Sequence, residues 1–466
     1  MSSSVDKLYQ DRFAELKPPL RPEEAVVEAD RCLYCYDAPC VTACPTHIDI
    51  PRFIKQIASG NLTGSAKTIL EANALGHSCA RACPVSVLCE GACVYHDWQQ
   101  KPIEIARLQR RATDQLHLEG RQPFKAGPDN GFKAAIIGAG PAGLACAMYL
   151  RRLGFAVTVF ERQTSPGGLN TFGIAEYKMT SRVSLDEIER IMKLGVDLKL
   201  GVEVGKDIPA DKLRSRFDAV FIGIGLGETK ALRLPGEDLP GVWDALSFIK
   251  HIKTRDLKPL GRSACTVVIG AGNTSIDAVT QAKRTGASRV VMAYRRSEAE
   301  MGAYDFEYAL AKTDGAEFVW NAAPIRILGK KQVEGVAFAR TETKNGKLAL
   351  TKKTFVVACD RVIKALGQTK QLSLAKALGL SLAGDGRIAV DEKTLRTSDS
   401  KVFAGGDAIN GGKEVVNAAA DGKRAAYAIF KALRPTAALP PGSDYWVSTI
   451  ESRALEYVPV PESVHA

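Results

Sequence analysis

Cysteine is concentrated in one short stretch of this chain. Eight of the eleven cysteines lie in two runs between residues 32 and 93. The first run holds Cys32, Cys35, Cys40 and Cys44, with Pro45 next, and the second holds Cys79, Cys83, Cys89 and Cys93, with Pro84 after its second cysteine. In a reducing compartment, clustered thiols more often bind metal than form disulfides. The stretch therefore predicts a unit held together by metal.

Length and charge set the wider limits. A chain of 466 residues has room for two to four domains. The first residues, MSSSVDKLYQDRF, lack an apolar core, and no run of about 18 apolar residues follows, so we expect a cytoplasmic protein with no membrane partner. The net charge of +11 is spread along the chain, and no recognition-helix signature accompanies it. A nucleic-acid partner is therefore not expected.

Residues 1–118 are predicted to form a helical, cysteine-rich domain. Between the cysteine runs, apolar residues recur at helical spacing at Ile50, Phe53, Ile54 and Ile57. Residues 103–116 repeat this pattern. A segment rich in Gly and Pro up to residue 132 marks the domain boundary.

From Lys133 onward, short β-branched runs alternate with helices, as in α/β folds with parallel sheets. A predicted strand, 134–137, leads into the glycine-rich turn Gly138, Gly140, Pro141, Ala142 and Gly143. The next strand, 156–160, ends at Glu161. Such a turn lets the backbone approach a pyrophosphate at a helix N-terminus, and the acid accepts hydrogen bonds from a ribose. The sequence therefore predicts a dinucleotide site here.

A second signature comprises Gly270, Ala271, Gly272, Asn273 and Thr274, after a predicted strand at 266–269. Ser275 replaces the third glycine, so we expect slightly looser packing of helix against strand. The following strand ends at Arg295 and Arg296 rather than at an acid. Arginines there suit a 2′-phosphate and favour NADPH over NADH, although two surface arginines remain the alternative interpretation.

A third motif, Gly405, Gly406 and Asp407, follows a short run of β-branched and aromatic residues. It resembles the second flavin motif of flavoproteins with two dinucleotide-binding domains, in which the NAD(P) domain is inserted into the FAD domain. That order implies FAD-binding parts at 131–228 and 367–434, an NAD(P) domain at 229–366 and a C-terminal tail at 435–466 that trails over the surface. Gly367 marks the second crossing between the domains.

The eight clustered cysteines suit either zinc or 4Fe–4S clusters, because both take four thiolates. The Cys-Pro dipeptides favour iron–sulfur clusters and hint that the two runs exchange a ligand, as in two-cluster ferredoxins. A flavin in the same chain adds a reason for redox metal. The other three cysteines, Cys146, Cys265 and Cys359, lie in apolar contexts and are expected to be buried packing residues.

The ordered motifs RCLYCYDAPCVTACPTHIDIPRFI, CARACPVSVLCEGACV, GAGPAG, GIGLGE, GAGNTSIDA and VFAGGDA resemble two related families. One is the glutamate synthase small subunit, and the other is the flavin- and NAD(P)-binding part of dihydropyrimidine dehydrogenase. The sequence around DAPC and CPTHIDIPRFI is more similar to the second family, especially to its separate bacterial flavin subunit. The resemblance covers nearly the whole chain.

The resemblance implies two 4Fe–4S clusters, FAD and NAD(P)H as cofactors. It assigns Cys32, Cys35, Cys40 and Cys93 to the first cluster. It assigns Cys44, Cys83, Cys89 and the side chain of Gln109 to the second cluster, so that Cys79 drops out. For FAD it implies residues 138–143, Glu161, Gly167, Gly168, Leu169, Lys178, Gly406 and Asp407. For NAD(P) it implies residues 271–274, Arg295 and Arg296, while Gly302 stands where the pyrimidine enzyme has a further arginine.

These features predict the electron-input subunit of a dihydropyrimidine dehydrogenase. NAD(P)H would reduce FAD, and the clusters would pass electrons to an FMN-containing catalytic subunit that reduces uracil or thymine. No side chain is expected to act as a catalytic acid, base or nucleophile. The alternatives are a glutamate synthase small subunit, an NAD(P)H:ferredoxin-type oxidoreductase, and a zinc-stapled nucleotide-binding scaffold.

Overall fold

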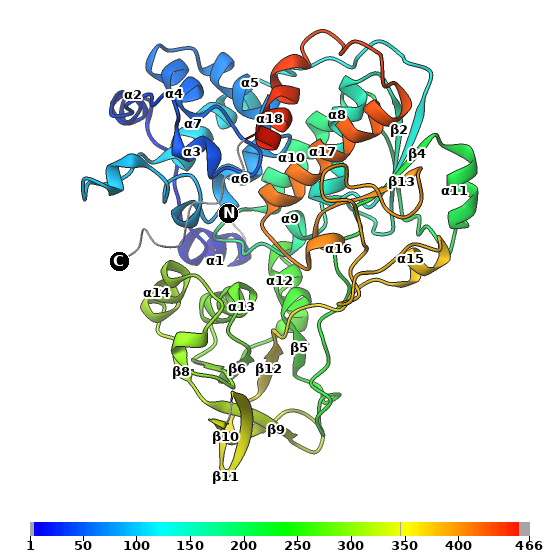
Figure 1. Ribbon diagram of the computed structural model, residues 1–466. Helices are drawn as coiled ribbons and strands as arrows, with labels where there is room; N and C mark the ends of the chain where they lie inside the picture. The colour runs from blue at the N-terminus through cyan, green and yellow to red at the C-terminus, as the bar shows by residue number, and fades with distance from the viewer. Residues whose placement is uncertain (1–3, 345, 456–466) are drawn as a thin grey trace. The chain divides into compact units, whose positions relative to one another are not determined.

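The computed structural model describes residues 4–344 and 346–455, and its backbone falls into two compact units (Figure 1). Unit 1 comprises residues 1–16, 171–181 and 227–369. Unit 2 comprises residues 17–170, 182–226 and 370–466. The sequence predicts an NAD(P) domain at residues 229–366. The corresponding segment of unit 1 spans residues 227–369.

The N-terminal part of unit 2 is helical. Its helices are α2 (Pro22–Asp30), α3 (Pro39–Thr42), α4 (Ile50–Ala58), α5 (Leu62–Ala72), α6 (Gly76–Ala82) and α7 (Ile105–Leu118), with short 3-10 turns η1 (Val85–Val87) and η2 (Val94–His96). Helix α4 begins where the side chain of Asp49 accepts a hydrogen bond from the Arg52 N–H. Its apolar positions, among them Phe53 and Ile54, are fully buried. Cys40 lies in α3 and Cys79 lies in α6, whereas the other six clustered cysteines lie in the loops and turns between these helices.

The rest of unit 2 is a parallel sheet covered by helices. The strands lie in the order β13–β4–β1–β2–β3, and all their pairings are parallel. Their bounds are β1 (Lys133–Ile137), β2 (Ala156–Glu161), β3 (Asp197–Leu200), β4 (Ala219–Ile222) and β13 (Val402–Ala404), and the helices are α8 (Pro141–Arg152), α10 (Ser181–Met192), α11 (Ala210–Arg216), α15 (Ser373–Ala377), α16 (Asp407–Asn410) and α17 (Val415–Leu433). Helices α8 and α17 pack so closely that a Cβ on Gly422 would lie 2.2 Å from the Ala142 carbonyl oxygen.

Unit 1 holds a second parallel sheet in the order β5–β12–β6–β7–β8. Its strands are β5 (Val242–Asp244), β6 (Cys265–Ile269), β7 (Arg289–Ala293), β8 (Glu317–Val319) and β12 (Arg361–Lys364), and its helices are α1 (Ser4–Arg12), α12 (Ala245–Lys253), α13 (Asn273–Arg284) and α14 (Asp305–Thr313), with turns η3 (Lys258–Leu260) and η4 (Glu298–Glu300). An antiparallel sheet of β9 (Ala322–Leu328), β10 (Gly335–Lys344) and β11 (Lys347–Ala358) precedes β12. Short helix α9 (Leu169–Phe172) lies where the chain passes from unit 2 to unit 1.

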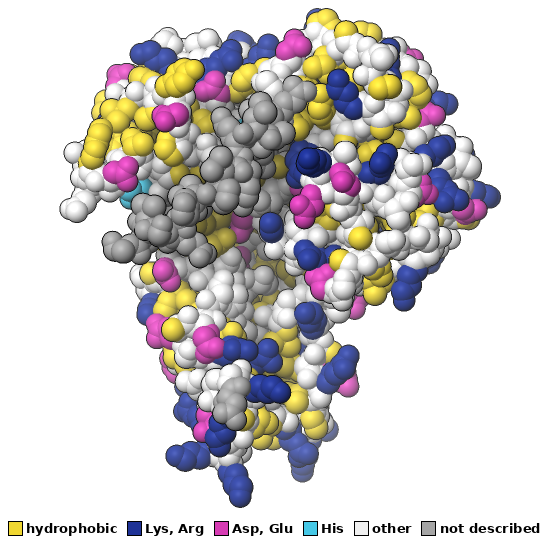
Figure 2. Space-filling model, viewed as in Figure 1, with side chains coloured by type: hydrophobic (Ala, Val, Ile, Leu, Met, Phe, Trp, Pro, Cys, Tyr) yellow, Lys and Arg dark blue, Asp and Glu magenta, His cyan; other side chains and the backbone are white. Residues whose placement is uncertain are grey.

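This architecture confirms the predicted fold class, a helical domain followed by two nucleotide-type parallel sheets, the second inserted into the first. Cys146, Cys265 and Cys359 are buried, in agreement with their predicted packing role. No helix in the described part of the chain is long and apolar enough to span a bilayer. On the face shown in Figure 2, Lys and Arg side chains are mixed with Asp and Glu.

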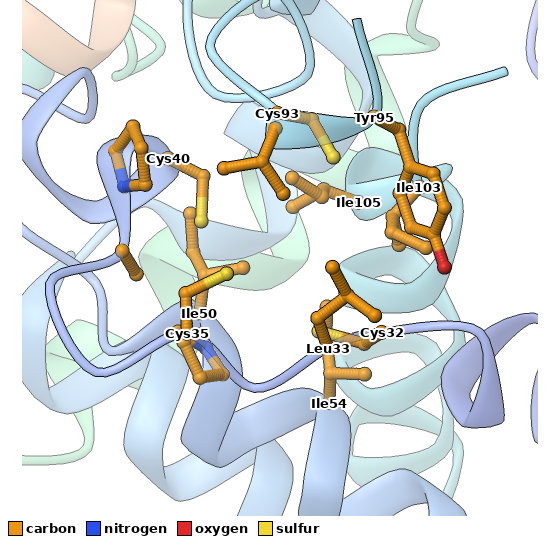
Figure 3. Close-up of a pocket in the computed structure, with 14 residues that line it drawn as sticks. Cys32, Leu33, Cys35, Cys40, Ile50, Ile54, Cys93, Tyr95, Ile103 and Ile105 are labelled. Atoms are coloured by element: carbon orange, nitrogen blue, oxygen red, sulfur yellow. The ribbon is translucent and has the colours of Figure 1, made fainter. Parts of the chain in front are cut away.

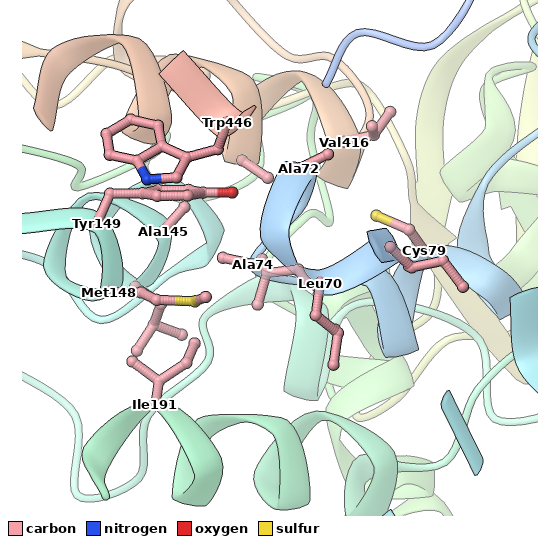
Figure 4. Packing of buried hydrophobic residues seen from close by; sticks show 14 of the residues in the cluster. Leu70, Ala72, Ala74, Cys79, Ala145, Met148, Tyr149, Ile191, Val416 and Trp446 are labelled. Carbon is pink, nitrogen blue, oxygen red and sulfur yellow. The ribbon is translucent and has the colours of Figure 1, made fainter. Parts of the chain in front are cut away.

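The expectation of a surface tail from residue 435 is wrong for part of that segment. Residues Asp444–Leu455 form helix α18, and its Trp446 is completely buried. The Trp446 ring lies 4.6 Å from the ring of Tyr149, centroid to centroid (Figure 4). The Pro-rich residues before α18 give a poor helix signal. Burial of the large Trp446 side chain nevertheless removes much apolar surface from water, which stabilises the packed helix. Residues 456–466 of the predicted tail lie outside the described residues.

Candidate nucleotide and metal sites

The first glycine-rich turn joins β1 to α8 in unit 2. Gly138 has a φ of +100°, and a Cβ there would lie 2.5 Å from the Gly223 carbonyl oxygen. At Gly143 a Cβ would lie 2.0 Å from the Gly138 carbonyl oxygen. Gly140 is different, because a Cβ there would meet only the Gly223 oxygen at 3.8 Å. The turn thus presents open backbone at the N-terminus of α8, which begins at Pro141 and continues through Ala142, as a pyrophosphate cradle requires.

Glu161 ends β2 beside this turn. Its Oε2 accepts a hydrogen bond from the Ala139 N–H at 2.8 Å, and its Oε1 accepts one from the Gln163 N–H at 2.8 Å. Each carboxylate oxygen has a second lone pair, so the group can still accept bonds from ribose hydroxyls. The two backbone bonds fix the orientation of the carboxylate beside the glycine-rich turn, and its role toward a ribose stays a prediction.

Gly167 and Gly168 also lie at the first glycine-rich turn. The Gly167 N–H donates to the Ala139 carbonyl oxygen at 2.8 Å, and both residues have positive φ. A Cβ on Gly168 would lie 3.3 Å from the Gly140 Cα. Leu169, the next residue, is 39% exposed at the start of α9. Glycines at both positions keep side chains away from the open backbone of the turn.

Gly406 and Asp407 follow β13 in the same unit. The Gly406 N–H donates to an oxygen of Asp421 at 3.0 Å, and the Lys413 N–H donates to Asp407 at 3.1 Å. Burial raises the pKa of Asp407, while the Lys413 bond acts in the opposite direction. Asp421 lies on α17 and was not singled out in the sequence. Only the folded chain brings this helix to the Gly-Asp turn.

Lys178 lies in unit 1, whereas the other residues implied for FAD lie in unit 2. Its ammonium forms ion pairs with Asp277 at 2.8 Å and with Glu307 at 2.6 Å. Burial alone would lower the pKa of Lys178, but the two carboxylates outweigh burial and hold the pKa above its usual range. Its role toward FAD stays a prediction, and the structure gives this lysine carboxylate partners of its own.

The second glycine-rich turn, in unit 1, joins β6 to α13. Ala271 is buried, and Gly272 precedes α13 with no atom within 4 Å of a Cβ built on it. Asn273 accepts a hydrogen bond from the Tyr304 N–H, and Thr274 is exposed. Ser275 accepts a hydrogen bond from the Gly272 N–H at 3.3 Å. The serine that replaces the third glycine therefore has a capping role, and the turn remains open to a phosphate.

Arg295 and Arg296 follow β7 in the same unit. Arg295 is exposed, and Arg296 forms an exposed ion pair with Glu300 at 2.7 Å. The Gly302 N–H donates to the Ala271 carbonyl oxygen at 3.1 Å, which brings the 295–302 segment against the glycine-rich turn. Gly367 is exposed in this unit with a φ of +76°, and its carbonyl accepts from the Lys230 N–H.

Four cysteines surround one hollow in the helical part of unit 2. Cys32, Cys35, Cys40 and Cys93 line about 370 Å³ of space, including the solvent at its mouth, among Ile50, Ile54, Ile103 and Ile105. The sulfur atoms of Cys35, Cys40 and Cys93 point toward this space (Figure 3). The structure thus brings together the four cysteines implied for the first cluster, although three come from one run and Cys93 from the other.

A second hollow, of about 380 Å³ counted in the same way, is lined by Cys44, Cys83, Cys89 and Gln109. Cys79 lines it as well, so the position of this residue does not by itself exclude it from the ligand set. The Gln109 Nε2 donates to the Gly76 carbonyl oxygen at 2.6 Å, which leaves the amide oxygen as the donor atom for a metal.

The donor chemistry of both hollows fits iron–sulfur clusters. Thiolates are their usual ligands, and apolar side chains fill the remaining walls. Asn73 also lines the second hollow; its side chain is completely buried, and its Nδ2 has no hydrogen-bond partner among the described residues. An amide N–H is a suitable donor to a cluster sulfur. By contrast, no three His, Cys, Asp or Glu side chains in the described residues are arranged to hold a single metal ion.

As free thiols, Cys40, Cys83 and Cys89 have raised pKa values and so resist ionisation. Burial raises the pKa of Cys40 to about 12 and also raises that of Cys89. A hydrogen bond with Cys79, and then burial, holds the pKa of Cys83 well above its usual range. Since only the thiolate binds metal, cluster binding must release these protons and offset that cost.

Two protein families match the chain. Residues 9–121 match the family described as dihydropyrimidine dehydrogenase domain II, 4Fe-4S cluster. Residues 132–422 match the family described as pyridine nucleotide-disulphide oxidoreductase.

Similar whole proteins include two kinds of subunit. The glutamate synthase (NADPH) small chain of Halomonas elongata is 34% identical over 439 residues, which cover 90% of this chain and 93% of that protein. The NAD-dependent dihydropyrimidine dehydrogenase subunit PreT of Salmonella typhimurium is 35% identical over 421 residues, which cover 90% of this chain and 97% of that protein.

Among solved structures, FprA of Mycobacterium tuberculosis in complex with NADPH has a TM-score of 0.53 and 19% identity, covering 69% of this chain and 90% of that one. Thioredoxin reductase of T. acidophilum has a TM-score of 0.52 and 23% identity, covering 64% of this chain and 98% of that one. These likenesses show the nucleotide-binding fold.

Proposed function

Because the chain belongs to the pyridine nucleotide-disulphide oxidoreductase family and carries an N-terminal 4Fe-4S domain, we propose that it is the electron-input subunit of a dihydropyrimidine dehydrogenase. In this proposal the chain oxidises NAD(P)H and supplies the electrons to a separate FMN-containing subunit that reduces uracil or thymine. The observation that carries the proposal is the presence of two thiol-lined hollows and an open FAD-type turn within one compact unit.

Each set of residues has a defined task in this proposal. The turn at 138–143 binds a pyrophosphate through backbone N–H groups, and Glu161 accepts bonds from the ribose. Backbone N–H groups at 271–274 bind the second dinucleotide. A bound FAD would supply the chemistry that links a two-electron donor to one-electron centres, because a flavin can take up one hydride and give up its two electrons one at a time. The protein contributes binding and orientation to hydride transfer and supplies no acid or base.

Gln109 favours the pyrimidine enzyme over glutamate synthase as the assembly to which this subunit belongs. It lines the second hollow together with four cysteines, and it is the residue that the resemblance to the pyrimidine enzyme implies as a cluster ligand. A neutral amide makes the site less negative than a fourth thiolate would. Relatives of both kinds are equally similar overall, so the experiment must separate them.

Exposed apolar side chains support a protein partner that docks on the helical domain. Among the described residues, seven large apolar side chains are exposed in this part of unit 2: Val26, Val27, Leu33, Tyr36, Val87, Trp98 and Leu118. Leu33 also lines the first hollow, and Tyr36 follows Cys35 directly. Exposed apolar groups beside a redox site suit contact with an electron acceptor.

The test is co-purification of the chain with its native partner, followed by two assays of the complex. With NADPH or NADH as donor, we expect uracil to be converted to dihydrouracil. Formation of glutamate from 2-oxoglutarate and glutamine, without dihydrouracil, would contradict the proposal and identify a glutamate synthase subunit. Reduction of ferredoxin without either product would identify the third alternative.

Removing the arginines after β7 is expected to change the choice of nicotinamide donor. In the double variant Arg295→Ala and Arg296→Ala, the kcat/KM for NADPH should fall by roughly 10- to 100-fold, the value of a charge-assisted bond to a phosphate. The kcat/KM for NADH should change by less than about threefold, because NADH lacks the 2′-phosphate. Dye-reduction assays with each donor measure both values.

Arg289→Ala is the matched control for this prediction. Arg289 lies at the start of the same strand and pairs with Glu317 at 2.6 Å in an exposed position. Its loss should leave both donors unaffected. If the unaltered protein uses NADH at least as efficiently as NADPH, the 2′-phosphate role of Arg295 and Arg296 is wrong.

A further inference from the structure

Lys423 is a cation buried within unit 2, on the helix that also supports the Gly-Asp turn. It lies on α17 and is only 2% exposed. Its Nζ donates to the Thr46 carbonyl oxygen at 2.7 Å, to the Ala72 carbonyl oxygen at 2.9 Å and to the Thr449 hydroxyl at 2.8 Å. Burying an ammonium costs much free energy, so such a residue needs an explanation.

The two carbonyl groups that Lys423 holds belong to two segments that wall the second hollow. Thr46 comes two residues after Cys44, and its Oγ1 lies 3.3 Å from the Cys44 Sγ. When Cys44 is a thiolate, the Thr46 hydroxyl must be the donor in this contact. Ala72 directly precedes Asn73, whose buried Nδ2 is the unpartnered donor at this hollow. One ammonium therefore fixes two segments at this hollow: Asn73 lines the hollow itself, and the Thr46 hydroxyl contacts the sulfur of Cys44, which lines it.

Helix α17 links this arrangement to the flavin-type turn. Val416 on its first turn lines the second hollow. Asp421, two residues before Lys423, accepts the Gly406 N–H at 3.0 Å. The Lys423 charge thus lies on an element shared by the flavin-type turn and the second hollow.

We propose that Lys423 is a positioning residue that raises the reduction potential of the second cluster, together with the donors Thr46 and Asn73 that it holds in place. This inference rests on the proposed function, since it requires a cluster in that hollow. One-electron reduction adds one negative charge and neither makes nor breaks a bond. A buried cation stabilises added negative charge strongly because the local dielectric is low. Hydrogen bonds to the sulfur atoms act in the same direction.

The experiment is a redox titration of the purified full-length protein, followed by electron paramagnetic resonance. Gln109→Cys identifies the signal of the second cluster, because it changes a ligand of that cluster. Lys423→Gln removes the charge but keeps a donor, and Asn73→Asp keeps the acceptor for the Leu75 N–H while it replaces the donor by a carboxyl group, which adds negative charge when ionised. Both should shift the second-cluster midpoint to a more negative potential and leave the first unchanged.

Lys423→Arg, which keeps the charge, should retain the unaltered midpoint, and Lys431→Met, which removes an exposed cation from the same helix, is the control. A second-cluster midpoint in Lys423→Gln equal to that of the unaltered protein would overturn the inference. So would loss of the second cluster from Lys423→Gln, because the residue would then serve only to hold the site together. If the unaltered protein holds no iron and acid-labile sulfide, the proposed function itself fails.

Discussion

Replacement of Cys83 by serine is expected to remove the second iron–sulfur cluster and leave the first intact. Iron and acid-labile sulfide should fall from about eight of each per chain to about four, because each cubane holds four. The reason is geometric, since Cys83 lines the second hollow with Cys44, Cys89 and Gln109. The same change at Cys40 should remove the other cluster. Metal and sulfide analysis of the anaerobically purified proteins measures both effects.

Cys79→Ser is the matched control for Cys83→Ser. Cys79 lies on α6, one helical turn before Cys83, and lines the same hollow. If Gln109 is the fourth ligand, the Cys79 variant retains about eight iron atoms. If it instead loses half of them while Gln109→Ala loses none, the ligand set implied by the resemblance is wrong. Zinc without sulfide in the unaltered protein would contradict the cluster interpretation and favour the zinc-stapled scaffold.

Gly140→Ala is expected to abolish FAD binding without unfolding the protein. A Cβ at this position has room in the chain itself, since its nearest neighbour would be an oxygen at 3.8 Å. The methyl group would occupy the backbone surface that a pyrophosphate must approach. Bound flavin should therefore fall from about one per chain to less than about a tenth. The absorbance of bound flavin and the thermal unfolding temperature measure the two parts of this prediction.

Substitutions at two other glycines distinguish an effect on flavin binding from an effect on folding. Gly384→Ala places a Cβ in open space and should change neither quantity. Gly143→Ala should lower the unfolding temperature as well as the flavin content, because its Cβ would lie 2.0 Å from a backbone oxygen. Full flavin content in Gly140→Ala would show that the turn at 138–143 does not bind the pyrophosphate.

The sequence predicts the parallel sheets well, because each strand and the turn that follows it are marked by residues next to one another in the chain. The observed bounds of β1, β2 and β6 each differ from the predicted bounds by one residue. Buried parallel strands consist of unbroken β-branched runs, and glycine-rich turns mark where each run ends. Helix α7 likewise follows from its apolar spacing.

Features that depend on distant contacts could not be predicted in this way. The association of Cys93 with Cys32, Cys35 and Cys40 depends on how helices that are separate in sequence pack together. The Cys-Pro dipeptides indicated an exchange between the two runs, but only the family resemblance identified Cys93. The burial of Trp446 depends on Tyr149, about 300 residues earlier. In the sequence, Asp421 and Lys423 look like surface charges of an otherwise Ala-rich helix, and only the fold shows their partners.

We expect this chain to pass electrons from NAD(P)H to iron–sulfur clusters through FAD. The most direct test is the anaerobic addition of NADPH, and separately NADH, to the purified protein, followed by electron paramagnetic resonance at low temperature. We predict that at least one donor produces the signals of reduced clusters, and that Gly140→Ala, loaded with iron but without flavin, produces none. Cluster signals of equal intensity in that flavin-free variant, or none in the fully loaded unaltered protein, would contradict the account.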